Sequence, residues 1–141
     1  MKIYFAGSIR GGRQDRDVYA EFIRALKNYG DVLTEQVGDL VTESLSEGGK
    51  TDAEIYRRDM AWLRQADALV AEVSTPSLGV GYEVAKAEEY GKPIFCLYRA
   101  GASQQLSAMI RGSNMLQVAE YSTREEGIRR IEEFLSNLDS S

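Results

Sequence analysis

ALVAEVSTPSLGVGYE, residues 68–83, is the stretch that decides the fold. Its first four residues form a short apolar run typical of a buried strand, and Val80, Val84 and Ala87 then recur at helical spacing. In the Ser- and Gly-rich turn between them, backbone N–H groups can bind a phosphate. A carboxylate, Glu83, follows, and we expect it in the first helical turn. A phosphate site beside a carboxylate indicates chemistry on a phosphorylated sugar.

Strands and helices alternate along the rest of the chain. Apolar runs predict strands over 2–6, 31–33, 68–72, 94–98 and 116–118. Helical spacing predicts helices over 15–29, 52–65, 79–90 and 103–111, and a last helix through Ile128, Ile131, Leu135 and Leu138. Gly30 and Gly91 fit the ends of two helices. Residues 38–52 are polar and lack an apolar period, which predicts a mobile loop, and residues 139–141 are predicted as a frayed tail.

This alternation predicts one α/β domain over residues 1–141, with a five-stranded parallel sheet and helices on both faces. We expect a Rossmann-like architecture with the flavodoxin-like strand order 2-1-3-4-5. In such sheets ligands bind beyond the carboxyl ends of the strands, where the strand order reverses. The turns after the first and third strands would then be neighbours, and they are the turns with unusual residues.

Composition excludes several classes of function. The net charge of −5 and the absence of a long basic run argue against a nucleic-acid partner. The single cysteine, Cys96, excludes an internal disulfide and a Cys-rich metal site, and its apolar neighbours predict that it is buried. Without histidine, acid–base chemistry falls to carboxylates, tyrosines or lysines. No signal peptide or membrane-length apolar run is present, which predicts a cytoplasmic protein with no membrane partner.

The turn after the first strand is rich in glycine and arginine. Glycines allow a ligand close to the backbone, and arginine suits phosphate. The spacing is neither that of a Walker loop nor that of a dinucleotide-binding fingerprint, and a flexible turn with solvated arginines is an equal alternative. The candidate residues are Gly7, Ser8, Ile9, Arg10, Gly11, Gly12 and Arg13. Tyr4, two residues before the end of the strand, either points its hydroxyl into the same cleft or belongs to the core.

Asp59 lies inside the apolar stripe of the second predicted helix. It is spaced four residues from Ile55 and three from Trp62, so burial without a partner would cost several kcal/mol. Asp59 is therefore either a functional carboxylate at the cleft or one neutralised by a hydrogen bond or an ion pair. Glu83 is either functional or an acid that favours a helix start. Together the two carboxylates could cleave a glycosidic bond.

Four segments resemble the 2′-deoxynucleoside 5′-phosphate N-hydrolases of the nucleoside 2-deoxyribosyltransferase-like superfamily. They are YFAGSIRGGR (4–13), VLTE (32–35), DMAWLRQADALVAEVSTPSLGVGYE (59–83) and LSAMIRG (106–112). The resemblance implies a Rossmann-like homodimer that hydrolyses the N-glycosidic bond of deoxynucleoside monophosphates to a free base and 2-deoxyribose 5-phosphate. It implies no metal and no organic cofactor.

The resemblance also implies roles for individual residues. The nucleophile falls on Glu83, through a covalent glycosyl-enzyme, and the acid/base residue on Asp59, with Tyr4 as the third catalytic residue. The implied substrate-binding residues are the Gly7–Arg13 turn, Phe22, Ser77 and Gly79, and, from the second copy of the chain, Ser107, Ala108 and Met109.

The chain departs from the resemblance at Gln36, where the mammalian members have histidine, and after Gly112, where its segment is shorter. The departure at Gln36 concerns base preference or the pH profile rather than the core reaction, and the shorter segment concerns the rim of the site. The alternatives are a nucleoside 2-deoxyribosyltransferase, a ribonucleotide N-glycosidase of the CMP type, and a non-catalytic nucleotide-binding module. A phosphoribohydrolase of the cytokinin-activating type is disfavoured because its PGGxGT stretch is absent.

Overall fold

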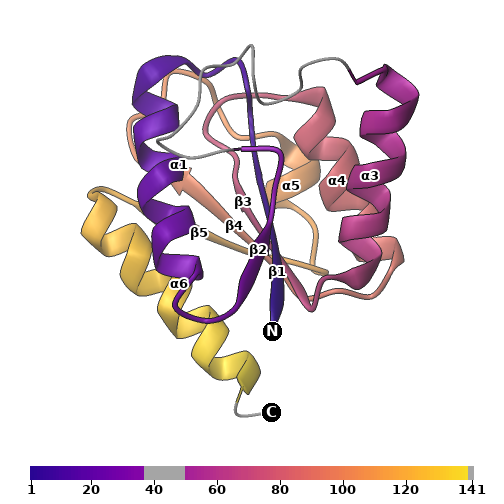
Figure 1. Cartoon of the computed structure of the whole chain (residues 1–141). Helices are drawn as coiled ribbons and strands as arrows, with labels where there is room; N and C mark the ends of the chain where they lie inside the picture. Colours follow the sequence, from indigo (N-terminus) through magenta and orange to yellow (C-terminus); the bar gives the residue numbers. More distant parts are fainter. Residues whose placement is uncertain (37–49, 140–141) are drawn as a thin grey trace.

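A computed structural model describes residues 1–36 and 50–139 of the chain. Five parallel strands form one sheet in the order β2-β1-β3-β4-β5, and helices cover both faces (Figure 1). The α/β class, the parallel sheet and the strand order are confirmed. The elements are β1 (Lys2–Gly7), α1 (Gly12–Leu26), β2 (Asp31–Leu33), α3 (Asp52–Gln65), β3 (Ala68–Glu72), α4 (Leu78–Glu89), β4 (Ile94–Arg99), α5 (Ala108–Arg111), β5 (Gln117–Tyr121) and α6 (Arg124–Asp139).

The strand order reverses between β1 and β3, which pair from Ile3 with Ala68 to Gly7 with Glu72. The chain moves from β1 outward to β2, then returns to β3 and continues in the other direction. The turns that leave β1 and β3 therefore start at the same edge of the sheet. This edge is the usual ligand site of such folds.

Two hydrophobic cores lie on opposite faces of the sheet. Because side chains alternate along a strand, Ile3 and Phe5 pack against α1 and α6, while Tyr4 and Ala6 pack on the side of α3 and α4. Figure 1 shows the two helix layers. This alternation places Tyr4 on the same side of the sheet as α3 and α4, which carry the candidate carboxylates.

Some boundaries differ from the sequence prediction. Helix α1 begins at Gly12 and ends at Leu26, so the prediction of 15–29 is displaced by three residues at each end. Gly12 has φ of +82°, which favours glycine at this helix start. Gly30 does not end a helix in the left-handed conformation. It is needed because a Cβ there would lie 1.9 Å from the carbonyl oxygen of Met1.

Other boundaries are closer. Gly91 follows α4 with φ of +71°, as predicted for a helix end. Only the last four residues of the predicted 103–111 helix are helical, and β5 extends to Tyr121. The mobile loop predicted over 38–52 lies largely outside the described residues, as do the last two residues of the predicted tail. Cys96 is buried, as predicted. Within residues 1–36 and 50–139, no helix has the length and apolarity needed to cross a bilayer.

Candidate active site

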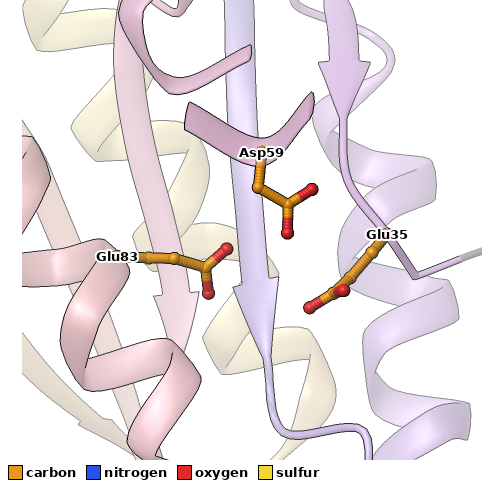
Figure 2. Close-up of side chains that lie close together, drawn as sticks. All are labelled: Glu35, Asp59 and Glu83. Atoms are coloured by element: carbon orange, nitrogen blue, oxygen red, sulfur yellow. The ribbon is translucent and has the colours of Figure 1, made fainter. Parts of the chain in front are cut away.

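Three carboxylates converge at the switch point of the sheet (Figure 2). Glu35, Asp59 and Glu83 each place one oxygen within 4.8 Å of an oxygen of the other two. Asp59 and Glu83 are only 7% and 6% exposed. The structure therefore brings together the two acids that the sequence selected, and adds a third.

Each carboxylate comes from a different element. Asp59 lies in the middle of α3, and a capping box formed by Thr51 and Glu54 fixes the start of this helix. Glu83 lies on α4, and Glu35 follows β2 by two residues. Glu83 is the sixth residue of α4, whose first turn contains no acidic residue, so our placement of Glu83 in the first turn is wrong. The explanation of Glu83 as an ordinary helix-start acid therefore does not apply.

Tyr4 is directly bonded to Glu83. Its buried hydroxyl donates a hydrogen bond to Glu83 Oε2. Burial and the neighbouring negative charge of Glu83 raise the pKa of Tyr4 far above its usual range. Tyr4 is therefore a hydrogen-bond donor at neutral pH, and it combines the two placements that the sequence left open, with its side chain in the core and its hydroxyl at the carboxylates.

Burial gives Glu83 an unusual affinity for a proton. Loss of hydration raises the pKa of Glu83 to about 8, the hydrogen bond from Tyr4 opposes this shift, and the charges of Glu35 and Asp59 add to it. Near neutral pH a proton is thus retained at Glu83, beside the two other carboxylates. Because interacting acids titrate together, the pKa at which this proton is lost belongs to the cluster rather than to one residue.

Arg58 neutralises part of this negative charge. Its Nη2 lies 2.9 Å from Asp59 Oδ1 and 3.8 Å from Glu35 Oε2, and its guanidinium stacks on Trp62 at 4.6 Å from the ring centroid. Asp59 thus combines the two roles that the sequence left open, as a carboxylate of the site and as a member of an ion pair. Carboxylates suit a hard cation such as Mg²⁺, and these three are the acids among the described residues close enough to hold one.

A cavity of about 450 Å³ opens beside the carboxylates. This volume is typical of a site for a small molecule. Apolar and aromatic side chains lie beside the acids in the lining of this cavity. The lining residues are Glu35, Asp52, Ile55, Tyr56, Asp59, Met60, Leu78, Gly79, Tyr82 and Glu83.

The turn between β3 and α4 borders this cavity. Ser77 caps α4, and its Oγ accepts a hydrogen bond from the Val80 backbone N–H at 3.2 Å. A Cβ at Gly81 would have no neighbour within 4 Å, and one at Gly79 would meet only Ser77 Oγ at 3.8 Å. The helix N-terminus thus has open space next to its N–H groups, as an anion site requires.

The Gly7–Arg13 turn does not line the cavity. Ser8 is buried and its Oγ accepts a hydrogen bond from the Arg10 backbone N–H at 3.2 Å, whereas Ile9 is 53% exposed. Gln36 donates a hydrogen bond from Nε2 to the Gly7 carbonyl at 2.8 Å. The turn is therefore connected to the segment that carries Glu35.

Two groups of candidates lie elsewhere. Phe22 is fully buried on the opposite face of the sheet, in edge-to-face contact with Tyr121, so the structure does not support it as a substrate contact. Its position in the apolar stripe of α1 explains this placement. Ser107 caps α5, and Met109, on the same short helix as Ala108, is 83% exposed. These last residues do not line the cavity of their own chain.

Seven of the ten lining residues were not among the predicted site residues, and three of these seven carry polar groups that bear on the chemistry or on the packing of the site. Glu35 could have been found, since it follows the strand next to β1 and thus lies at the same edge of the sheet. Tyr56 and Tyr82 come from neighbouring helices, and their hydroxyls are 3.1 Å apart. Their rings meet edge to face, with centroids 5.9 Å apart. No local pattern in the sequence indicated this pair, because it forms only when α3 packs on α4.

The comparison with known families agrees with this geometry. The model of the family described as nucleoside 2-deoxyribosyltransferase matches residues 3–128. The chain belongs to the nucleoside 2-deoxyribosyltransferase family. Among its relatives in this family, a 5-hydroxymethyl-dUMP N-hydrolase from Mus musculus is 51% identical over an alignment of 129 positions that covers 87% of this chain and 73% of that protein. Another, from Danio rerio, is 46% identical over an alignment of 145 positions that covers 98% of each chain.

Solved structures show the same family fold at lower identity. The structure of BlsM has a TM-score of 0.74 at 19% identity and covers 95% of this chain and 88% of that one. A CMP N-glycosidase from Clostridium botulinum, BcmB, has a TM-score of 0.69 at 14% identity and covers 94% and 99%. These likenesses support the Rossmann-like fold alone.

Proposed function

We propose that this protein is an N-glycosidase that hydrolyses 2′-deoxynucleoside 5′-monophosphates to a free nucleobase and 2-deoxyribose 5-phosphate. The observation that carries the proposal is the convergence of Glu83, Asp59 and Tyr4 beside a nucleotide-sized cavity. The relatives named N-hydrolases, whose sequences are about half identical to this one, support the same reaction.

The reaction proceeds in two steps. Glu83 attacks C1′ of the sugar, the C1′–N bond breaks, and Asp59 gives its proton to the departing base. Water then attacks C1′, Asp59 takes up its proton, and the ester to Glu83 breaks. Carboxyl groups about 5 Å apart are typical of glycosidases that form a covalent intermediate, and the oxygens here are within 4.8 Å.

The open N-terminus of α4 suits the 5′-phosphate. We assign Ser77 and Gly79 to its binding, because helix N–H groups and a serine hydroxyl can bind a phosphate. The Gly7–Arg13 turn, at the same edge of the sheet, is assigned to the sugar and base. Binding the phosphate away from the reacting bond orients the sugar between the two carboxylates.

A panel of deoxynucleoside monophosphates tests the proposal, with free base measured by chromatography. We expect hydrolysis of at least one member, and weaker or no release of base from the matching ribonucleotide and from the deoxynucleoside without phosphate. Adding a second free base separates hydrolysis from transfer, since a transferase would form a new nucleotide. Absence of any free base across the panel would leave a nucleotide-binding module as the better explanation.

Because the cluster holds a proton, we can predict how the replacement of Tyr4 changes the pH dependence of the reaction. The reaction needs one proton on the cluster, so kcat/KM of the unchanged protein should fall as pH rises through about 8. The Tyr4 hydrogen bond lowers the pKa of Glu83, so Tyr4→Phe should move this fall to higher pH and reduce kcat by about tenfold or more. A pH–rate profile that does not move would contradict the role of Tyr4.

We also propose that the protein is a homodimer in which Ser107, Ala108 and Met109 complete the site of the neighbouring copy. Leu78 at the start of α4 is 97% exposed and Met109 is 83% exposed, and a second chain would cover such apolar groups. Light scattering across a dilution series should give twice the chain mass. A monomer at working concentration would remove these residues from the site.

The cytoplasm is the compartment we propose for the protein.

A further inference from the structure

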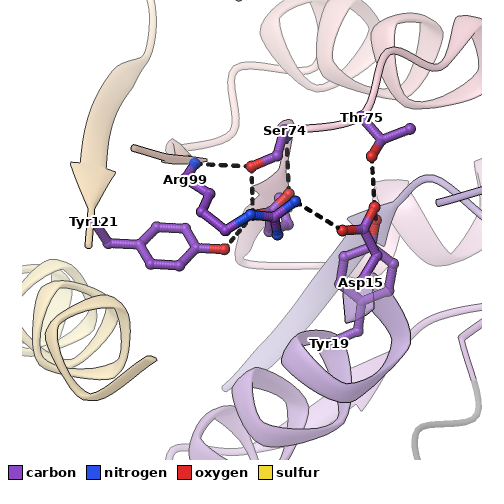
Figure 3. A network of polar contacts seen from close by, with 7 residues as sticks. Asp15, Tyr19, Ser74, Thr75, Arg99 and Tyr121 are labelled. Carbon is purple, nitrogen blue, oxygen red and sulfur yellow. Dashed lines mark hydrogen bonds and ion pairs between the residues drawn. The ribbon is translucent and has the colours of Figure 1, made fainter. Parts of the chain in front are cut away.

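A second group of polar side chains is buried on the other face of the sheet, against α1 (Figure 3). Asp15 is 1% exposed and Glu72 is fully buried. Neither belongs to the carboxylate cluster, and the reaction does not use them. We call this group the buried polar network, and it consists of Asp15, Tyr19, Glu72, Ser74, Thr75, Arg99 and Tyr121.

The network holds the residues that enter the β3–α4 turn. Thr75 Oγ1 donates to Asp15 Oδ2 at 2.5 Å. The backbone N–H and the hydroxyl of Ser74 donate to Glu72 at 2.8 and 2.7 Å, and the Arg99 backbone N–H donates to Ser74 Oγ at 2.8 Å. Ser74 and Thr75 thus have fixed positions directly before the turn assigned to the phosphate.

The same network supports the turn after β1. A Cβ at Gly11 would lie 1.8 Å from Asp15 Oδ2, and a Cβ at Gly7 would lie 2.7 Å from the Tyr19 ring. Both glycines therefore pack directly on network side chains, which leave no room for a larger residue. Asp15 contacts one turn through Gly11 and the other through Thr75.

A buried charged network of this kind is not the most stabilising way to fill a core. Arg99 Nη2 lies 3.1 Å from Asp15 Oδ1, which compensates the buried carboxylate. Well-packed apolar residues often stabilise as much as such a pair or more. Directional bonds instead define relative positions, and here they connect the β3–α4 turn, which borders the cavity, with the turn after β1, which we assign to the sugar and base.

We propose that Asp15 is a positioning residue that sets the spacing between the two substrate-binding turns, through Thr75 on one side and Gly11 on the other. This inference rests on the proposed function. It assigns to the network a role in binding the 5′-phosphate, without contact between the network and the reacting atoms.

Thr75→Val tests the inference, because valine keeps the shape of threonine and removes the hydroxyl that donates to Asp15. We expect KM for the deoxynucleoside monophosphate to rise by about tenfold, as for the loss of one hydrogen bond to a charged group, with kcat within about twofold. The inhibition constant of inorganic phosphate should rise by a similar factor. Thr75→Ser keeps the donor and should restore both values.

The possible outcomes separate the two proposals. Suppose that the unchanged protein hydrolyses the substrate, and that Thr75→Val has the same KM and the same inhibition constant for phosphate. This result would overturn the positioning role alone. The positioning role would also be overturned if Thr75→Val and Thr75→Ser lost activity equally and their melting temperatures fell in parallel. No hydrolysis by the unchanged protein would overturn both proposals. Thr75→Ala, which removes the hydroxyl without adding a methyl group, serves if Thr75→Val does not fold.

Discussion

Glu83→Gln is expected to lower kcat by a factor on the order of 10⁴ or more, because a neutral amide cannot attack C1′. Binding should persist. Glutamine has nearly the shape of the protonated glutamic acid, and its oxygen can still accept the hydrogen bond from Tyr4. The measurements are single-turnover kinetics and calorimetric titration with the best deoxynucleotide of the panel.

The covalent step gives this prediction a direct readout. Acid quenching of the unchanged protein during turnover should leave a fraction whose mass is increased by one 2-deoxyribose 5-phosphate less one water. Peptide mapping should place the added mass on Glu83, and Glu83→Gln should lack it. Appreciable turnover by Glu83→Gln, or the added mass on another residue, would refute the assignment of the nucleophile.

A matched control comes from the same helix. Glu89 lies on the surface of α4 and pairs with Lys86 at 3.0 Å, an exposed ion pair that contributes little to stability. Glu89→Gln makes the same chemical change at a residue that does not line the cavity. We expect its kinetics and melting temperature to match those of the unchanged protein, which separates the loss of the nucleophile from a general effect of charge.

The fold could be predicted from the sequence because its signals are local. Buried parallel strands appear as continuous apolar runs, and β1, β3 and β4 are buried almost throughout. The strand order came from the habit of such folds, and the structure confirmed it. The boundaries of α1 were less accurate, because Tyr29 packs against the core from a turn and thereby extends the apolar period beyond the helix.

The site was only partly predictable. Asp59 could be singled out because a charged side chain interrupts the apolar stripe of a helix, and such a side chain is costly to bury unless it has a function or a partner. For Phe22 the two kinds of signal disagree, since its helical spacing predicts the core, where the structure places it, whereas the family resemblance implies a substrate contact. Glu35 has no periodic context, and its role depends on where β2 places it next to β1. The network at Asp15 joins residues up to 84 positions apart, which no local pattern reveals.

Asp59→Asn is the second large effect that we expect. The amide cannot give a proton to the departing base or take one from water, so kcat should fall by roughly 10²–10⁴-fold. Asp67→Asn is the control, because Asp67 lies beyond the end of α3 and accepts a hydrogen bond from the Lys2 N–H at 2.8 Å, which asparagine can also accept. The control should keep its full kcat.

The pH profile separates this role from simple damage to the site. The charge of Asp59 helps to raise the pKa of Glu83, so Asp59→Asn should lower that pKa. Without the proton donor at position 59, the residual activity should rise with pH as Glu83 ionises and then remain level, whereas the unchanged protein loses activity above about pH 8. A deoxynucleotide whose base departs readily without protonation should be affected least. A variant that keeps the fall above pH 8 would show that Asp59 is not the proton donor.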